Sequence, residues 1–76
     1  MGMINEHDRV VLTIDLKNDK LAAGDVGTVV HVYDERKAFE VEFVALDGET
    51  VAVVTLEYTQ VRPVEHGEIT HARRVA

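Results

Sequence analysis

Four histidines and fourteen acidic residues are the side chains of this 76-residue sequence that could bind a metal ion or move a proton. A zinc site needs three or four ligands that converge on one point. The local group Glu65, His66, Glu68 and His71 has suitable residue types, and on a flexible segment it would chelate only weakly. Few large apolar residues surround this group to hold it rigid, so we expect no metal site.

Nucleophiles and phosphate-binding loops are also missing from the sequence. It contains no cysteine and no serine, which excludes disulfides and both of the common nucleophiles. The stretch Gly24-Asp25-Val26-Gly27 has no Lys-Ser or Lys-Thr pair after it, so it is not a phosphate loop. No carboxylate lies on an evidently apolar face, where desolvation would raise its pKa for acid–base catalysis. We therefore expect a protein that is not an enzyme and has no cofactor.

The charge balance bears on the kind of partner. Eight basic residues against fourteen acidic ones give a formal net charge of −6, which opposes binding to phosphate backbones. The basic residues lie mostly at 17–20, 36–37 and 73–74, so a local basic patch would require these segments to meet. No apolar run approaches the ~18 residues that span a membrane, and the first residues lack the features of a signal peptide. These features disfavour nucleic acid and membranes as partners and make the cytoplasm the default location.

Strands must position whatever surface the protein uses. Alternating apolar and polar residues, many of them β-branched, predict strands at residues 9–16, 28–33, 38–44, 49–56 and 61–62. A charged loop at 34–37 would join the second strand to the third. Asp47-Gly48 predicts a two-residue type I′ turn with positive φ at both positions. This pattern is typical of one small, strongly bent barrel over residues 5–64, followed by a flexible tail at 65–76.

Pairing the strands through these two loops gives each strand one apolar face, with Phe39 opposite both Val32 and Leu56. The expected core is Val10, Leu12, Ile14, Val26, Val30, Val32, Phe39, Val41, Phe43, Ala52, Val54, Leu56 and Val61.

The opposite, outward face is expected to carry Val29, His31, Tyr33, Glu40, Glu42, Val44, Val51 and Val53. Val44 would lie beside Val51, and His31 would lie opposite Glu40, either as a plain surface pair or as a pH-sensitive one. A contiguous apolar group with acidic members is a candidate partner surface. An ordinary sheet surface covered by a loop or the tail is the alternative.

The stretch Gly24-Asp25-Val26-Gly27-Thr28-Val29-Val30-His31-Val32 resembles the glycine-turn-strand signature of KOW-type and other SH3-like small barrels. Over about residues 5–64 the chain is most similar to a family of small uncharacterised bacterial proteins. Members are often encoded beside a second small gene, in arrangements that suggest an antitoxin and its toxin. The chain also resembles, more distantly, the SH3-like subunits that dock on photosystem I, ferredoxin–thioredoxin reductase and nitrile hydratase. The resemblance implies an all-β, five-stranded SH3-like barrel that performs no catalysis.

From these features we expect a non-catalytic protein-binding module, with the antitoxin of a toxin–antitoxin pair as one role. Its partner would be a basic protein, because complementary charge speeds encounter, or a second copy in a homodimer. A KOW-type nucleic-acid- or ribosome-associated domain is the alternative, and a docking subunit of an electron-transfer complex is a third hypothesis.

Overall fold

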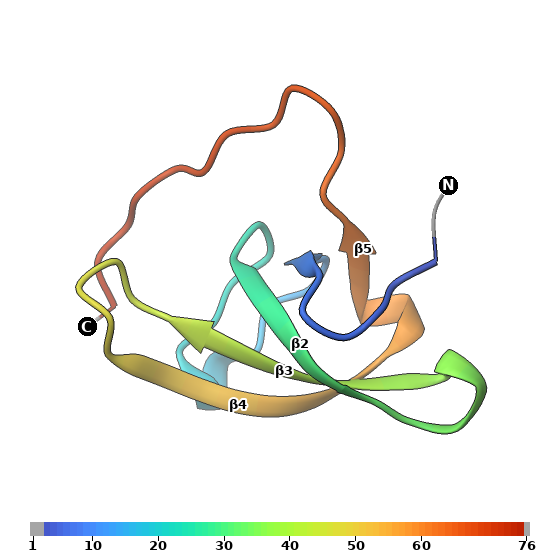
Figure 1. Ribbon diagram of the computed structural model, residues 1–76. Helices are drawn as coiled ribbons and strands as arrows, with labels where there is room; N and C mark the ends of the chain where they lie inside the picture. Colours follow the sequence, from blue (N-terminus) through green and yellow to red (C-terminus); the bar gives the residue numbers. More distant parts are fainter. Residues whose placement is uncertain (1–2, 76) are drawn as a thin grey trace.

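The structure is a computed structural model that describes residues 3–75. Five antiparallel strands form one sheet in the order β4-β3-β2-β1-β5 (Figure 1). The strands are β1 (Arg9–Leu12), β2 (Val26–Val32), β3 (Ala38–Val44), β4 (Thr50–Glu57) and β5 (Val61–Pro63). The connections contain the short 3-10 helices η1 (Lys17–Asp19), η2 (Asp34–Arg36) and η3 (Tyr58–Gln60). The expected all-β, five-stranded fold is confirmed, and no helix of the described residues has the length and hydropathy needed to cross a membrane.

The first strand is shorter than the alternation predicts. β1 ends at Leu12 rather than at residue 16, because the chain then leaves the sheet and Leu16 forms an isolated bridge with Leu21 around η1. Ile14 is consequently 37% exposed, and its expected place in the core is wrong. Leu21 is only 5% exposed and joins the core in its stead.

The core contains most of the expected residues. Those confirmed as buried are Val10, Leu12, Phe39, Val41, Phe43, Leu56 and Val61. Val32, Ala52 and Val54 are half-buried and pack against this cluster. Val26 is half-buried as well.

A β-bulge in β2 changes the expected alternation. Val29 pairs with Val41, whereas His31 pairs with Glu40, so Val30 is an extra residue with no opposite partner. The inserted residue reverses the inward and outward alternation on one side of the bulge. Val29 is therefore fully buried in the core, and Val30 is 42% exposed. The prediction had these two valines the other way round.

The β3–β4 hairpin has the predicted register along most of its length, from the pair Ala38–Glu57 to the pair Phe43–Ala52. Near the turn the register shifts, and Val44 pairs with Thr50 rather than with Val51. Gly48 has φ +96°, as expected, whereas Asp47 does not have the positive φ that a type I′ turn requires. The turn is nevertheless longer than a two-residue type I′ turn. The N–H of Gly48 donates to the carbonyl of Ala45, and the N–H of Ala45 donates to the carbonyl of Glu49, both at 2.8 Å.

The two glycines before the second strand have different roles. Gly24 has φ +96° and makes the turn, whereas Gly27 lies inside β2 and is buried. A Cβ atom at Gly27 would be 2.5 Å from Cγ1 of Val41 and 2.8 Å from Cε2 of Phe43. Gly27 is thus needed for the close approach of β2 to the core side chains of β3.

Candidate functional site

The sheet surface of β2, β3 and β4 that points away from the core holds six of the eight predicted site residues. We call this set the outer face: His31, Tyr33, Glu40, Glu42, Val44 and Val53. Val29 is excluded from it by the bulge in β2. Val51 is excluded as well, because the register shift near the turn leaves it half-buried against the core.

Apolar side chains on the outer face are open to solvent. Tyr33 is 41% exposed, Val44 45% and Val53 49%. Val53 lies directly opposite Glu42 on the neighbouring strand. Exposed apolar groups that share a face with carboxylates provide both contact area and charge to a partner protein.

Hydroxyl groups hold the two carboxylates of the outer face in place. Glu40 Oε1 accepts hydrogen bonds from Oγ1 of Thr55 at 2.5 Å and from the hydroxyl of Tyr33 at 3.3 Å. Glu42 Oε2 accepts one from Oγ1 of Thr50 at 2.8 Å. These donors are neutral hydroxyl groups, so they orient both carboxylates without pairing either of them with a cation.

His31 has a different ionic partner from the one expected. It pairs with Glu40 in the strand register, but its Nδ1 lies 3.8 Å from Oε2 of Glu6 in the N-terminal segment. Its ring also meets Tyr33 edge-on, with 4.5 Å between the ring centroids. Both ends of the Glu6 pair are about half exposed, so the ion pair contributes little stability.

Negative charge is concentrated on the β3–β4 hairpin. Residues 38–57 include five acidic side chains and no basic one: Glu40, Glu42, Asp47, Glu49 and Glu57. Within residues 3–75, the ion pairs join Glu6 to His31, Glu35 to Lys37, Arg62 to Glu65 and Glu68, and Asp25 to Arg73. None of these pairs uses an acidic residue of the hairpin. The hairpin is therefore the most negative surface of the described chain.

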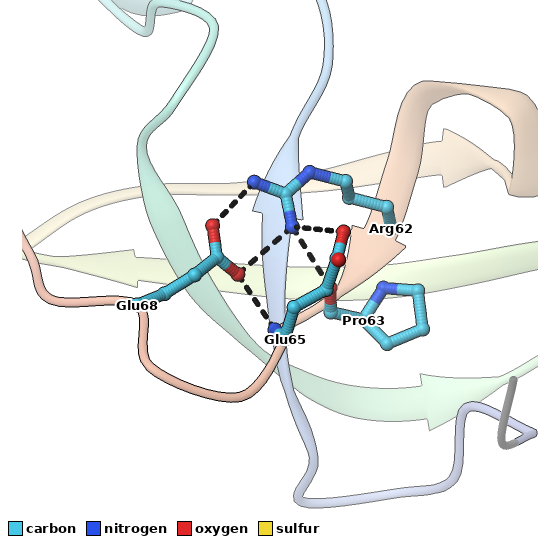
Figure 2. A network of polar contacts seen from close by, with 4 residues as sticks. All are labelled: Arg62, Pro63, Glu65 and Glu68. Carbon is cyan, nitrogen blue, oxygen red and sulfur yellow. Dashed lines mark hydrogen bonds and ion pairs between the residues drawn. The ribbon is translucent and has the colours of Figure 1, made fainter.

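The C-terminal segment is tied to the barrel first through Arg62 (Figure 2). The Arg62 guanidinium binds the Glu68 carboxylate through two hydrogen bonds, from Nη1 to Oε1 at 2.9 Å and from Nη2 to Oε2 at 2.6 Å. Glu68 Oε1 also accepts a hydrogen bond from the N–H of Glu65 at 2.6 Å. The hydrogen bonds from Arg62 and from this N–H lower the pKa of Glu68 to about 2.

A second tie lies farther along the same segment. The guanidinium of Arg73 donates to both carboxylate oxygens of Asp25, with 2.9 Å between Nε and Oδ1, and to the carbonyl of Lys20 at 3.0 Å. Partial burial raises the pKa of Asp25, but the hydrogen bonds from Arg73 and from the N–H of Ala22 outweigh it, so that pKa is lowered. Sequence reasoning missed both ties: Arg62 and Glu68 are 6 positions apart across the turn after β5, and Asp25 and Arg73, which are 48 positions apart, are paired by no local pattern.

Within residues 3–75, no group of three histidine, aspartate or glutamate side chains is placed to hold a metal ion. A cavity of about 250 Å³ lies between the C-terminal segment and the barrel, with Val11, Val26 and Val64 among its lining residues. The carboxylate in its lining is that of Glu68, which is already bound to Arg62.

The fold and this surface define a small all-β domain with an acidic, partly apolar outer face. The model of one protein family, described as "Domain of unknown function (DUF4926)", matches residues 6–63. The chain belongs to that family. No curated protein and no solved structure matches the chain.

Proposed function

We propose that the protein is a non-catalytic binding module whose outer face binds a basic region of a partner protein. The observation that carries this proposal is the placement of five carboxylates on one hairpin without a basic residue among them. Glu40 and Glu42 of this set lie on the outer face, together with the exposed apolar side chains of Tyr33, Val44 and Val53. Charge complementarity would direct the encounter, and the apolar groups would supply contact area.

The same charge distribution disfavours the other two occupants considered from the sequence. In a symmetric dimer through the outer face, a second copy of the chain would bring its Glu40 and Glu42 carboxylates against those of the first copy. Nucleic acid requires free basic side chains, and two of the eight basic residues, Arg62 and Arg73, are bound to carboxylates. Arg36 donates to the carbonyl of Ile4 and to Oδ1 of Asn5.

Neutralisation of a basic toxin is the cellular role we favour for such a module. An acidic antitoxin that covers a basic active-site region would need the charge and the exposed apolar groups of the outer face. This role follows the resemblance of the sequence to antitoxin-like proteins, and the protein would exert it in the cytoplasm.

The experiment compares two substitutions that add the same charge at different places. Val53→Lys changes the centre of the outer face, and Ile69→Lys changes a C-terminal side chain that is 92% exposed. The wild-type protein is used to capture its partner from the native host, and affinities are then measured with the purified partner. We expect Val53→Lys to weaken binding at least tenfold, which is ~1.4 kcal/mol. Ile69→Lys should bind as the wild type does.

The controls separate a binding defect from a folding defect. Both side chains are exposed, so each substitution should change the free energy of unfolding by no more than about 0.5–1 kcal/mol. Equal binding by the wild type and Val53→Lys would contradict the proposal. A nucleic acid, an acidic protein or a second copy of the chain as the captured partner would contradict it as well.

A further inference from the structure

The strand β4 is an open edge of the sheet. It pairs with β3 on one side, and in the described part of the chain no strand pairs with its other side (Figure 1). The core-facing side chains of β4 are less buried than their partners on β3. Val41 and Phe43 on β3 are 0% and 2% exposed, whereas Ala52 and Val54, their partners on β4, are only half-buried.

The hydrogen-bond pattern identifies the backbone groups at this edge. The N–H of Tyr58 donates to the carbonyl of Lys37 at 3.0 Å, which fixes the phase of the ladder. Bonded and non-bonded pairs alternate in an antiparallel ladder. Ala52, Val54 and Leu56 therefore bond to β3, and the N–H and C=O groups of Val53 and Thr55 point away from it. Among residues 3–75, no backbone or side-chain group is hydrogen-bonded to these outward groups.

β4 also lacks the features that usually protect an edge strand. Proteins block such edges with proline, lysine, a central bulge or a covering segment. β4 contains neither proline nor lysine, and its register shift lies at its first residues, before the regular stretch 52–57. The other edge, β5, is three residues long and ends at Pro63. The geometry thus distinguishes β4 as the edge that can accept another strand.

We propose that β4 accepts an extended basic segment of the partner protein as a sixth strand of the sheet. This inference rests on the proposed function, because the outer face supplies the charge complementarity that selects the partner. The segment would carry lysine or arginine at alternate positions, beside Val53 and Thr55 on the outer side. From there a long basic side chain reaches the carboxylates of Glu42 and Glu40 on the next strand.

The intervening positions of the segment would be apolar. Their side chains would point to the inner side of the sheet, beside the half-buried Ala52 and Val54. Main-chain hydrogen bonds to Val53 and Thr55 would supply affinity, and the alternating pattern would supply specificity. Two copies of β4 would satisfy the same hydrogen bonds, but residues 38–57 of a second copy carry no basic side chain to pair with Glu40 and Glu42, so a second copy is not the occupant.

The probe is a synthetic peptide, Arg-Val-Arg-Val-Arg-Val-Arg, with acetyl and amide ends. Two N-methylated forms are its matched controls, one methylated on the arginine amides and the other on the valine amides. In an antiparallel added strand, the arginine amides face β4 and the valine amides face solvent. We expect methylation of the arginine amides to weaken binding at least tenfold and methylation of the valine amides to weaken it less than threefold.

Hydrogen exchange provides a second, direct measurement. Without peptide, the amides of Val53 and Thr55 should exchange much faster than those of Val54 and Leu56, which are bonded to β3. With saturating peptide, the exchange of Val53 and Thr55 should slow at least tenfold. Val53→Pro removes one outward N–H without removing a bond to β3, and it should weaken peptide binding at least tenfold.

The outcomes separate strand addition from the proposed function. If both methylated peptides bind equally and Val53 and Thr55 gain no protection, strand addition is wrong. If binding in that case still falls with Glu42→Gln, the acidic outer face remains the binding surface. If the unmethylated peptide does not bind, strand addition by a basic segment is overturned. The comparison of Val53→Lys with Ile69→Lys on the native partner then decides the proposed function alone.

Discussion

Replacing Gly27 by alanine tests the packing of β2 against β3. The added Cβ would lie 2.5 Å from Cγ1 of Val41, 2.8 Å from Cε2 of Phe43 and 3.0 Å from the carbonyl oxygen of Glu42. Carbon atoms in ordinary contact are ~3.5–4.0 Å apart, so these neighbours would have to move by roughly 1 Å. Val41 and Phe43 are 0% and 2% exposed, and the third neighbour is backbone, so none can move into solvent.

Overpacking of a well-packed core costs about 1–3 kcal/mol, and the backbone neighbour places Gly27→Ala near the upper end of that range. In a domain of this size, 1 kcal/mol corresponds to roughly 4–8 °C in Tm. We therefore expect thermal unfolding, followed by circular dichroism, to shift downward by about 10–20 °C. Gly24→Ala is the matched control, because a Cβ there meets no atom within 4 Å. Its cost is the positive φ alone, about 1–2 kcal/mol.

A double mutant identifies the cause of the loss. Val41→Ala alone leaves a cavity, but in combination with Gly27→Ala it removes the closest of the three contacts. The loss in the double mutant should therefore be smaller than the sum of the two single losses. A Gly27→Ala protein that melts within two degrees of the wild type, or strictly additive losses, would refute the reasoning.

Three further predictions concern the core, the hairpin and the C-terminal tie. Phe43→Ala should cost about 3–5 kcal/mol in urea unfolding, and a change below 1 kcal/mol would contradict its place in the core. Gly48→Val should destabilise the protein markedly, because Gly48 has φ +96° and a β-branched residue resists that conformation, whereas Gly48→Asn should be tolerated better. The pKa of Glu68, about 2 in the folded protein, lies below its usual value. The stabilising contribution of the Arg62–Glu68 pair is therefore present above about pH 4.5 and is lost as the pH falls through about 2; NMR of the Glu68 carboxyl should show this titration, and Glu68→Gln should abolish it.

The sequence was sufficient to predict the strands in which polar and apolar residues alternate strictly. In β3 the phenylalanines and valines alternate with Glu40 and Glu42, so both its bounds and its pairing with β4 were predictable. In β2, by contrast, Val29 and Val30 are adjacent and chemically equivalent, so either could face the core. Only the position of the bulge decides between them, and it depends on how β2 curves against β1 and β3.

The candidate site was predictable to the same extent. Six site residues were predicted correctly, because the predicted inward and outward alternation holds at their positions in the strands. These residues are His31, Tyr33, Glu40, Glu42, Val44 and Val53. Val51 was misplaced because the turn at Asp47-Gly48 is longer than the dipeptide suggests, which shifts the register at the end of the strand. The tie between Asp25 and Arg73 depends on tertiary proximity over 48 positions, which no local pattern encodes.

The two register shifts also change what the outer face can use for binding. They remove Val29 and Val51 from the predicted apolar group. They also place Thr50 opposite Val44, and from there the Thr50 hydroxyl donates a hydrogen bond to the carboxylate of Glu42. With less apolar area, affinity in the proposed complex would depend more on the carboxylates and on the open backbone of β4. Charge contributions at such an exposed surface are screened by salt, whereas main-chain hydrogen bonds are screened far less. The association rate with the partner should therefore fall steeply between low and physiological ionic strength, while the dissociation rate, which main-chain bonding governs, should change little.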